Sequence, residues 1–140
     1  MTIWKKQAGK FIKKPWGYVH EIQSPFSMGA KIINLKAEER TSLKYYKNCN
    51  QLIILYEGKV LVEAPGEKEF QDFTENGRNY FELNPGNCLL IQAASPYRIS
   101  ALEDSVLIEV LGGRRSSNDD TVMLEDDYGR ATINKNIAGE

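Results

Sequence analysis

Short stretches in which hydrophobic and polar residues alternate make up most of this chain, and glycine, proline or asparagine interrupts them about every ten residues. No stretch keeps the 3.6-residue period of an amphipathic helix, so the pattern predicts an all-β protein. We expect strands over Tyr18–Ile22, Gly29–Leu35, Thr41–Tyr46, Gln51–Tyr56, Lys59–Ala64, Asn79–Leu83, Asn87–Gln92, Tyr97–Ala101 and Ser105–Leu111. Eight or nine strands of this kind indicate a sandwich or a barrel.

Turn residues and changes in composition mark the limits of the barrel. Glu57–Gly58 and Asn84–Asn87 are strong turn signals between strands. The polar segment Pro65–Gly77 predicts a long exposed loop or an extended hairpin tip, and the chain becomes polar again after Gly113. A chain of 140 residues fits one domain. We expect an N-terminal arm at 1–13, the barrel at 14–113 and an extended C-terminal tail at 114–140.

Composition and charge narrow the kinds of ligand. The 18 Lys and Arg residues nearly balance the 19 Asp and Glu residues, so the chain lacks the positive field that holds nucleic acid or an anionic membrane. No apolar run approaches the ~20 residues that span a bilayer, and Met1–Lys14 lacks the apolar core of a signal peptide. Cys49 and Cys88 fit neither a Cys-x-x-Cys motif nor a disulfide framework. We therefore expect a cytoplasmic protein with a small-molecule ligand.

Four stretches of the sequence occur in an order that is specific as a set. They are Lys14–Tyr18, Arg40–Leu43 with Glu57–Gly58, Leu83–Gly86 with Pro96–Arg98, and Leu124–Arg130. Together they resemble the cupin domain of type II mannose-6-phosphate isomerases, which is often fused to a mannose-1-phosphate guanylyltransferase. The resemblance implies an antiparallel double-stranded β-helix, or jelly roll, that forms a homodimer. In such cupins, glutamine, histidine, glutamate and histidine bind a divalent metal at the mouth of the barrel.

All four positions that correspond to these metal ligands carry other residues. Counted without gaps back from Gly58, they are Lys44, Tyr46 and Gln51, and the position after the second-motif proline is Tyr97. A lysine ammonium has no lone pair for a metal, and a chain with one histidine cannot build a multi-histidine site. We therefore expect no metal, no other cofactor, and loss of the metal-dependent isomerase step.

Lys44 and Tyr46 share one face of their strand, because side chains repeat every second residue. The resemblance places that face inside the barrel. A lysine inside a barrel loses hydration, which lowers its pKa unless a carboxylate or an anionic ligand compensates. Glu109 lies between Leu107 and Leu111 on its own face, where an acid seldom points to water. We therefore predict a contact between Lys44 and Glu109.

Further residues are candidates for binding a ligand. The candidate substrate contacts are Trp16, Arg40, Gln51 and Arg130. An arginine offers a planar fork to a phosphate, and a tryptophan can stack on a sugar. Trp16 can equally pack between the arm and the barrel, and Arg130 can equally hold down the tail. Arg98 alternates with Tyr97, so we expect it to face outward.

Three functions remain open at this point. The first is a cupin that binds a sugar phosphate or nucleotide sugar in carbohydrate or polysaccharide metabolism. The second is a metal-independent sugar isomerase or epimerase that uses Lys44, Tyr46, Tyr97 or Glu109. The third is a structural or interaction module whose own side chains, above all Tyr46 and Tyr97, fill the pocket. Apolar side chains on both faces of Ile32–Ile33 and Leu52–Leu55 offer a surface for the expected homodimer.

Overall fold

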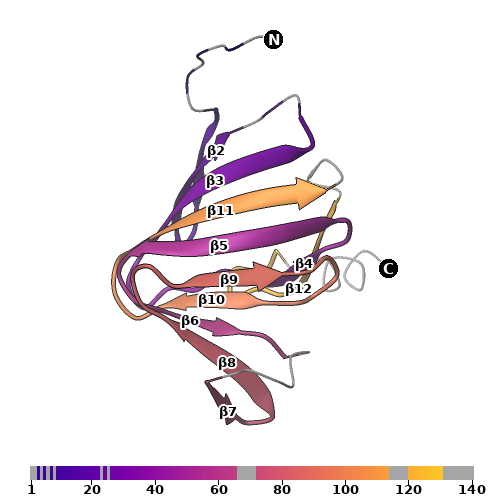
Figure 1. Cartoon of the computed structure of the whole chain (residues 1–140). Coiled ribbons are helices and arrows are strands. Elements are labelled where there is room, and N and C mark those ends of the chain that lie inside the picture. The colour runs from indigo at the N-terminus through magenta and orange to yellow at the C-terminus, as the bar shows by residue number, and fades with distance from the viewer. Residues whose placement is uncertain are drawn as a thin grey trace.

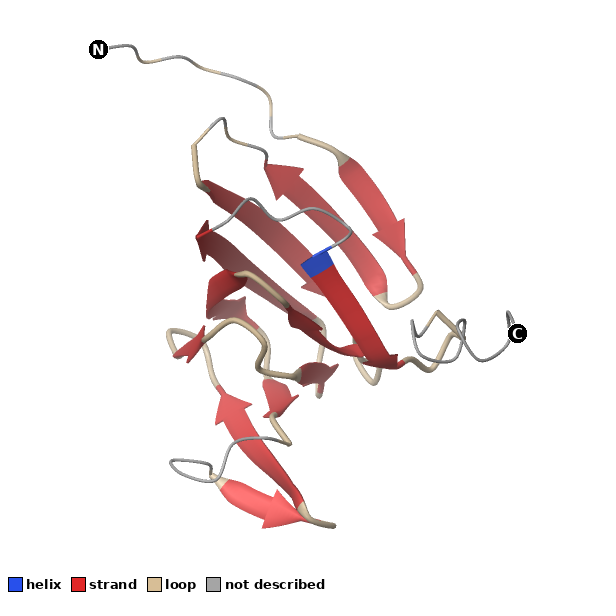
Figure 2. Ribbon diagram, turned by 90° about the vertical axis from the view of Figure 1, so that its right-hand side faces the viewer, coloured by secondary structure: helices blue, strands red, loops and turns tan. Residues whose placement is uncertain are grey.

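Strands make up most of the regular structure of this chain (Figure 2). The computed structural model describes residues 3, 5, 7, 9–22, 24, 26–65, 72–113 and 120–130. The strands are β1 (Phe11–Lys14), β2 (Gly17–Ile22), β3 (Met28–Leu35), β4 (Leu43–Tyr46), β5 (Cys49–Glu57), β6 (Val60–Glu63), β7 (Phe73–Glu75), β8 (Arg78–Leu83), β9 (Cys88–Ile91), β10 (Arg98–Ala101), β11 (Ser105–Gly113) and β12 (Thr121–Glu125). The prediction of an all-β protein is confirmed. Within the described ranges, no helix is long and apolar enough to cross a membrane.

The strands pair antiparallel in a topology dominated by non-local contacts. A six-stranded sheet has the order β1-β2-β3-β11-β5-β9, a four-stranded sheet has the order β10-β6-β8-β7, and β12 pairs with β4. Figure 1 shows the six-stranded sheet as one wall of the molecule, with β10, β6, β8 and β7 below it. Isolated bridges from Lys44 to Tyr97 and from Arg40 to Ser100 connect the segment around β4 to the segment around β10.

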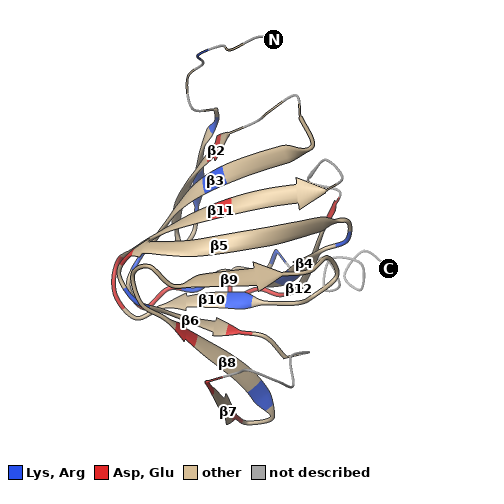
Figure 3. Cartoon of the chain, in the orientation of Figure 1, with Lys and Arg blue, Asp and Glu red and all other residues tan. Residues whose placement is uncertain are grey.

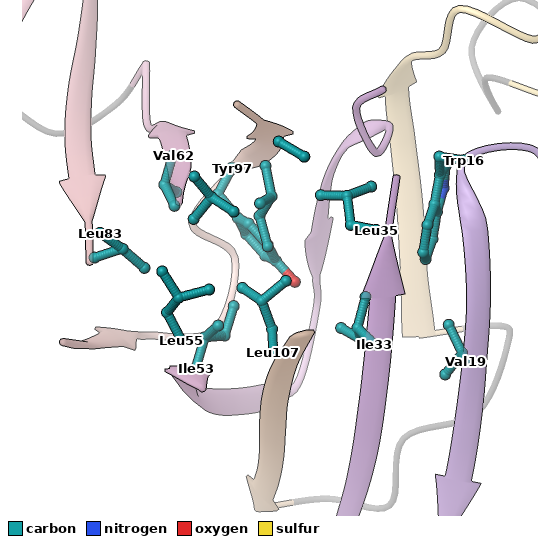
Figure 4. Packing of buried hydrophobic residues seen from close by; sticks show 13 residues of the cluster. Trp16, Val19, Ile33, Leu35, Ile53, Leu55, Val62, Leu83, Tyr97 and Leu107 are labelled. Atoms are coloured by element: carbon teal, nitrogen blue, oxygen red, sulfur yellow. The ribbon is translucent and has the colours of Figure 1, made fainter. Parts of the chain in front are cut away.

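An apolar cluster fills the space between the sheets. The register aligns Val19, Ile33, Leu107 and Leu55 across neighbouring strands of the six-stranded sheet. These side chains share one face, because residues directly opposite in antiparallel strands point the same way. Figure 4 shows Leu107 and Leu55 near Tyr97, with Ile33 and Val19 farther along the same layer, and all five residues belong to one buried cluster. Burial contributes about 1.5–3 kcal/mol for each large aliphatic side chain, so this cluster is a main source of stability.

Two glycines of the sequence motifs allow close backbone contacts. Gly17 has φ +154°, and a Cβ there would lie 1.9 Å from the carbonyl oxygen of Asn34. Gly58 has φ +98°, and a Cβ there would lie 2.6 Å from the carbonyl oxygen of Asp104. Residues other than glycine disfavour a positive φ, and neither site has room for a side chain. These motif positions are therefore explained by the backbone alone.

Three strands lie where the sequence did not predict them. Strand β1 belongs to the segment that we expected to be mostly an arm, and it pairs with β2. Strand β7 lies inside the segment Pro65–Gly77 and pairs with β8, which follows that segment. This agrees with the alternative of a hairpin tip, although residues 66–71 lie outside the described residues. Strand β12 lies in the expected C-terminal tail and pairs with β4. Each of these strands is short, and its pairing partner supplies the backbone hydrogen bonds that local pattern cannot reveal.

Candidate functional site

A row of charged side chains crosses the six-stranded sheet beside the apolar cluster. Lys31 on β3 lies directly opposite Glu21 on β2 and Glu109 on β11. Figure 3 shows opposite charges side by side on β3 and β11. The alternation that points Ile33 and Leu35 inward also points Lys31 inward. Glu109 is only 1% exposed, so it is also part of the interior. The interior of the barrel therefore has an apolar part and, next to it, a charged part.

Strand β4 supplies a second lysine and a tyrosine to the charged part. Lys31 Nζ donates a hydrogen bond of 2.9 Å to the Tyr46 hydroxyl. Lys31 Nζ and Lys44 Nζ each lie 5.5 Å from the centre of the Tyr46 ring. An ammonium near an aromatic ring is attracted to it by about 0.5–2 kcal/mol. The ammonium groups of two half-buried lysines thus lie near one buried phenol.

Gln51 connects a tyrosine to the buried carboxylate. Its Nε2 donates to the Tyr97 hydroxyl at 2.6 Å and to Glu109 Oε1 at 2.5 Å. The predicted contact of Lys44 with Glu109 is absent from the ion pairs and hydrogen bonds of the part of the chain that the structure describes. The register explains the difference, because it places Lys31 rather than Lys44 opposite Glu109. Gln51, Tyr97 and Glu109 therefore form one hydrogen-bonded group beside the two lysines.

Solved structures similar to this chain share its architecture, although no family model and no curated protein matches its sequence. KdgF from Halomonas sp. matches with a TM-score of 0.60 and 17% identity over 76% of this chain and 90% of KdgF. Oxalate decarboxylase from Bacillus subtilis matches with a TM-score of 0.69 and 18% identity over 93% of this chain and 34% of the enzyme. CapF matches with a TM-score of 0.62 and 14% identity over 84% of this chain and 34% of CapF. All three contain cupin domains. This chain has the cupin fold.

The likeness to these cupins concerns the fold. Cupins host many functions, and identities of 14 to 18% do not transfer a substrate from one to another. The resemblance of the sequence motifs to mannose-6-phosphate isomerases concerns one family among the cupins, and membership of that family stays a prediction. The function of this cupin therefore depends on the side chains inside its own barrel.

Burial keeps both tyrosines of the cupin interior protonated. Burial, with the charge of Glu109, raises the pKa of Tyr46 to about 12. Burial and the same carboxylate also raise the pKa of Tyr97 well above its ordinary value. At neutral pH both hydroxyl groups are therefore able to donate hydrogen bonds.

The two lysines have opposite pKa shifts. Burial and then the positive charge of Lys31 lower the pKa of Lys44 to about 8, although Glu109 partly opposes this effect. Burial also acts to lower the pKa of Lys31, but its contacts with Tyr46 and the charge of Glu109 outweigh burial and raise it. Lys31 is therefore a stable cation, whereas Lys44 titrates near physiological pH.

Two more cations act on this part of the cupin. Burial lowers the pKa of Lys14, and the charges of Arg130 and Lys31 lower it further. Arg130 donates to both carboxylate oxygens of Asp126, each at 3.0 Å. The four interacting cations are Lys14, Lys31, Lys44 and Arg130. The carboxylates that face them are Glu21, Glu109 and Asp126. The region therefore holds more positive than negative groups when Lys44 is protonated.

The structure places the predicted substrate contacts in different surroundings. Gln51 lies in the polar interior, hydrogen-bonded as described. Trp16 is buried in the apolar cluster, beside Leu35 in Figure 4. Arg40 lies outside this interior, and its Nε and Nη2 each donate to Asp127 at 2.6 Å. Arg130 already has a carboxylate partner. Roles for these four residues in binding a ligand remain predictions.

The expectation that Arg98 faces outward to solvent is wrong. Arg98 is only 2% exposed. Its Nε donates to the carbonyl oxygen of Thr41 at 3.0 Å, and its Nη1 donates to Glu125 Oε2 at 3.3 Å. Glu125 is the last residue of β12, so the C-terminal segment covers a strand face that alternation alone assigns to water.

The residues in the charged interior do not fit a divalent metal ion. A protonated Lys31 or Lys44 repels a cation and offers it no lone pair. The Glu109 carboxylate already accepts a hydrogen bond from Gln51. The described residues contain no group of three or more His, Cys, Asp or Glu side chains arranged to hold a metal. The side chains present instead favour an anion.

The sequence analysis missed Lys31 and Lys14. Lys31 follows the same alternation as Ile33 and Leu35, so its inward position could have been found from the pattern of its own strand. Lys14 ends β1, a strand that the sequence did not predict. Neither lysine belongs to a position of the metal-binding motif.

Proposed function

We propose that this cupin binds a phosphorylated sugar or a nucleotide sugar in carbohydrate metabolism and lacks the metal-dependent isomerase step of mannose-6-phosphate isomerases. The observation that carries the proposal is the convergence of four cations, Lys14, Lys31, Lys44 and Arg130, on a polar interior where three carboxylates face them. A phosphate supplies the missing negative charge. The resemblance of the sequence motifs to the isomerase family supports a sugar as the rest of the ligand.

The contacts of the interior indicate which residues would bind the phosphate of such a ligand and which would bind its sugar. Lys31 is fixed by Tyr46, whereas Lys44 has neither an ion pair nor a side-chain hydrogen bond among the residues described. Lys44 is therefore the group best able to take up an anion. The Tyr46 and Tyr97 hydroxyl groups can bind sugar hydroxyls, and aromatic rings suit the apolar faces of sugars.

A ligand-dependent shift in melting temperature tests this proposal. We expect mannose 6-phosphate or GDP-mannose to raise Tm, because a ligand that binds only the folded state stabilises it by about 2.7 kcal/mol at one hundred times Kd. Unphosphorylated mannose should raise Tm less. Lys44→Met should remove most of the phosphate-dependent shift, whereas Lys36→Met, at an exposed position, should keep it. The absence of a shift with every phosphorylated compound would contradict the proposal.

A metal-independent sugar isomerase or epimerase is the second candidate. The observation that favours it is the pair of lysines with opposite pKa shifts beside two protonated tyrosines. Groups with separated pKa values are suited to acid and base roles. The third candidate, a non-catalytic module with a self-filled pocket, is favoured by the hydrogen bonds that Tyr46 and Tyr97 already make inside the barrel.

We also propose that the cupin is a cytoplasmic homodimer that pairs through the outer face of its six-stranded sheet. On that face Ile108 lies opposite both Ile32 and Ile54. Leu52 lies opposite both Leu90 and Val110, and Leu90 is 77% exposed. An exposed row of apolar side chains on one face of a sheet is a feature of protein interfaces.

A further inference from the structure

The surroundings of Lys44 and Lys31 differ although both amines approach one ring. Each Nζ lies 5.5 Å from the centre of the Tyr46 ring. Lys31 donates to the Tyr46 hydroxyl and lies opposite two carboxylates, Glu21 and Glu109. Lys44 is half-buried and has no side-chain hydrogen bond or ion pair within the described ranges. A ligand that reaches the amine of Lys44 would therefore displace no polar partner from it.

A fixed cation beside a second lysine favours the neutral form of that second lysine. Protonation of Lys44 places another positive charge near Lys31, which its carboxylate neighbours keep charged. Desolvation next to another cationic group is one way in which proteins make a lysine nucleophilic. A neutral amine has a lone pair that can attack a carbonyl carbon, which an ammonium lacks.

We propose that Lys44 is a nucleophilic amine that forms a reversible imine with the carbonyl group of an anionic ligand, such as the open-chain form of a sugar phosphate or a 2-oxo acid. The part of this inference that makes the ligand an anion rests on the proposed function. The part that makes Lys44 a nucleophile rests on the positions of Lys44 and Lys31 around the Tyr46 ring. It assigns a covalent activity to an interior that has no fitting site for a metal.

The reaction balances without an oxidant or a reductant. The lone pair of Lys44 Nζ attacks the carbonyl carbon, the carbon–oxygen π electrons move to oxygen, and one proton passes from nitrogen to oxygen to give a carbinolamine. Nitrogen then forms a double bond to carbon, the carbon–oxygen bond breaks, and the oxygen leaves as water with the second amine proton. The Lys31 ammonium and the Tyr46 hydroxyl, joined by a hydrogen bond of 2.9 Å, can relay this second proton: one of them protonates the departing oxygen and then regains a proton from the nitrogen.

Charged and titratable groups from several elements surround the Lys44 amine. They are Lys14 on β1, Lys31 on β3, Tyr46 on β4, Glu109 on β11, Tyr97 before β10 and Arg130 after β12. The cations among them favour the neutral amine, and Glu109 opposes them. Imine formation should therefore increase as the pH rises toward the pKa of Lys44, about 8.

Reductive trapping with site-resolved mass spectrometry tests the inference. The full chain is incubated with pyruvate and sodium cyanoborohydride at pH 7.5, and the reduced adduct on each lysine is quantified after digestion. We expect Lys44 to be modified at least tenfold faster than the exposed Lys36. Modification of Lys44 no faster than Lys36 would overturn the inference, and this measurement needs no variant.

A variant of the neighbouring lysine gives a second, independent test. Lys31→Met removes the charge that lowers the pKa of Lys44, so the pH at which trapping reaches half its maximum should rise. An unchanged pH profile in a folded Lys31→Met protein would also contradict the inference. Thermal shift with GDP-mannose, which has no free carbonyl group, tests binding separately. A Tm shift with GDP-mannose but no trapped adduct on Lys44 would support the binding proposal and refute the imine. A trapped adduct on Lys44 without any Tm shift would support the imine and refute the binding proposal.

Discussion

At the scale of single residues, Lys44 is held in the protein at a cost to stability. Its folded-state pKa of about 8 lies below its ordinary value of 10.5. The unfolded chain therefore binds the proton more tightly, and stability rises as pH increases through the window between these two values. Below about pH 8 the ammonium costs on the order of 1–3 kcal/mol. A residue kept at such a cost is more readily explained by a ligand than by packing.

Replacement of this lysine by an apolar side chain should stabilise the protein. We expect Lys44→Met to raise the free energy of unfolding at pH 7 by on the order of 1–2 kcal/mol, because the uncompensated ammonium is removed. The gain should shrink between pH 8 and pH 10, where the wild-type amine loses its proton. Urea denaturation at several pH values measures this, with Lys36→Met as the exposed control. A variant less stable than the wild type at pH 7 would contradict the prediction.

The residues of the interior show what sequence reasoning can and cannot find. Tyr46, Gln51, Tyr97 and Glu109 were expected together, and hydrogen bonds or charge effects do connect them. Glu109 acts on Lys44 only through its charge, because the pairing of β3 with β11 places Lys31 opposite Glu109 and because alternation within one strand does not reveal which residues a neighbouring strand brings opposite. Lys31 does not belong to the metal-binding motif, so the motif does not point to it, whereas its alternation with Ile33 and Leu35 does.

At the scale of elements, the C-terminal segment is tied to the barrel by three arginines. Glu125 at the end of β12 accepts hydrogen bonds from Arg78 at 3.2 Å and from Arg98 at 3.3 Å. Asp127 binds Arg40 and lies 3.9 Å from Arg98 Nη2, an atom with no hydrogen-bond partner among the described residues. Ion pairs to the barrel thus account for the charged residues of the sequence motif Leu124–Arg130. Local composition alone predicted only that this segment belongs to a tail.

Removal of one carboxylate from this cluster should loosen the segment. We expect Glu125→Gln to destabilise the protein by about 1–2 kcal/mol, because Arg98 is almost fully buried and loses a charged partner. Glu82→Gln is the matched control, since it breaks the exposed pair with Lys59 and should cost less than about 1 kcal/mol. Urea denaturation compares the two variants. Equal effects would show that burial of Arg98 does not matter.

At the scale of the whole molecule, the proposed homodimer depends on the outer face of the six-stranded sheet. Leu90→Glu places a charge at the exposed end of the row Leu90–Leu52–Val110, on the edge strand β9. We expect this variant to be monomeric by light scattering at concentrations where the wild type is dimeric. Leu102→Glu, in the exposed turn between β10 and β11, should remain dimeric. A wild-type monomer at high concentration would contradict the proposed interface.

The order of the strands also has a consequence for how the protein is made. Strand β11 lies between β3 and β5, and β12 pairs with β4, so strands synthesised early wait for partners that leave the ribosome much later. Chains with such distant pairings fold slowly, commonly in milliseconds to seconds. Until β11 and β12 emerge, β4 lacks its pairing strand and β3 lacks Glu109 opposite Lys31. The charged interior is therefore completed among the last events of biosynthesis.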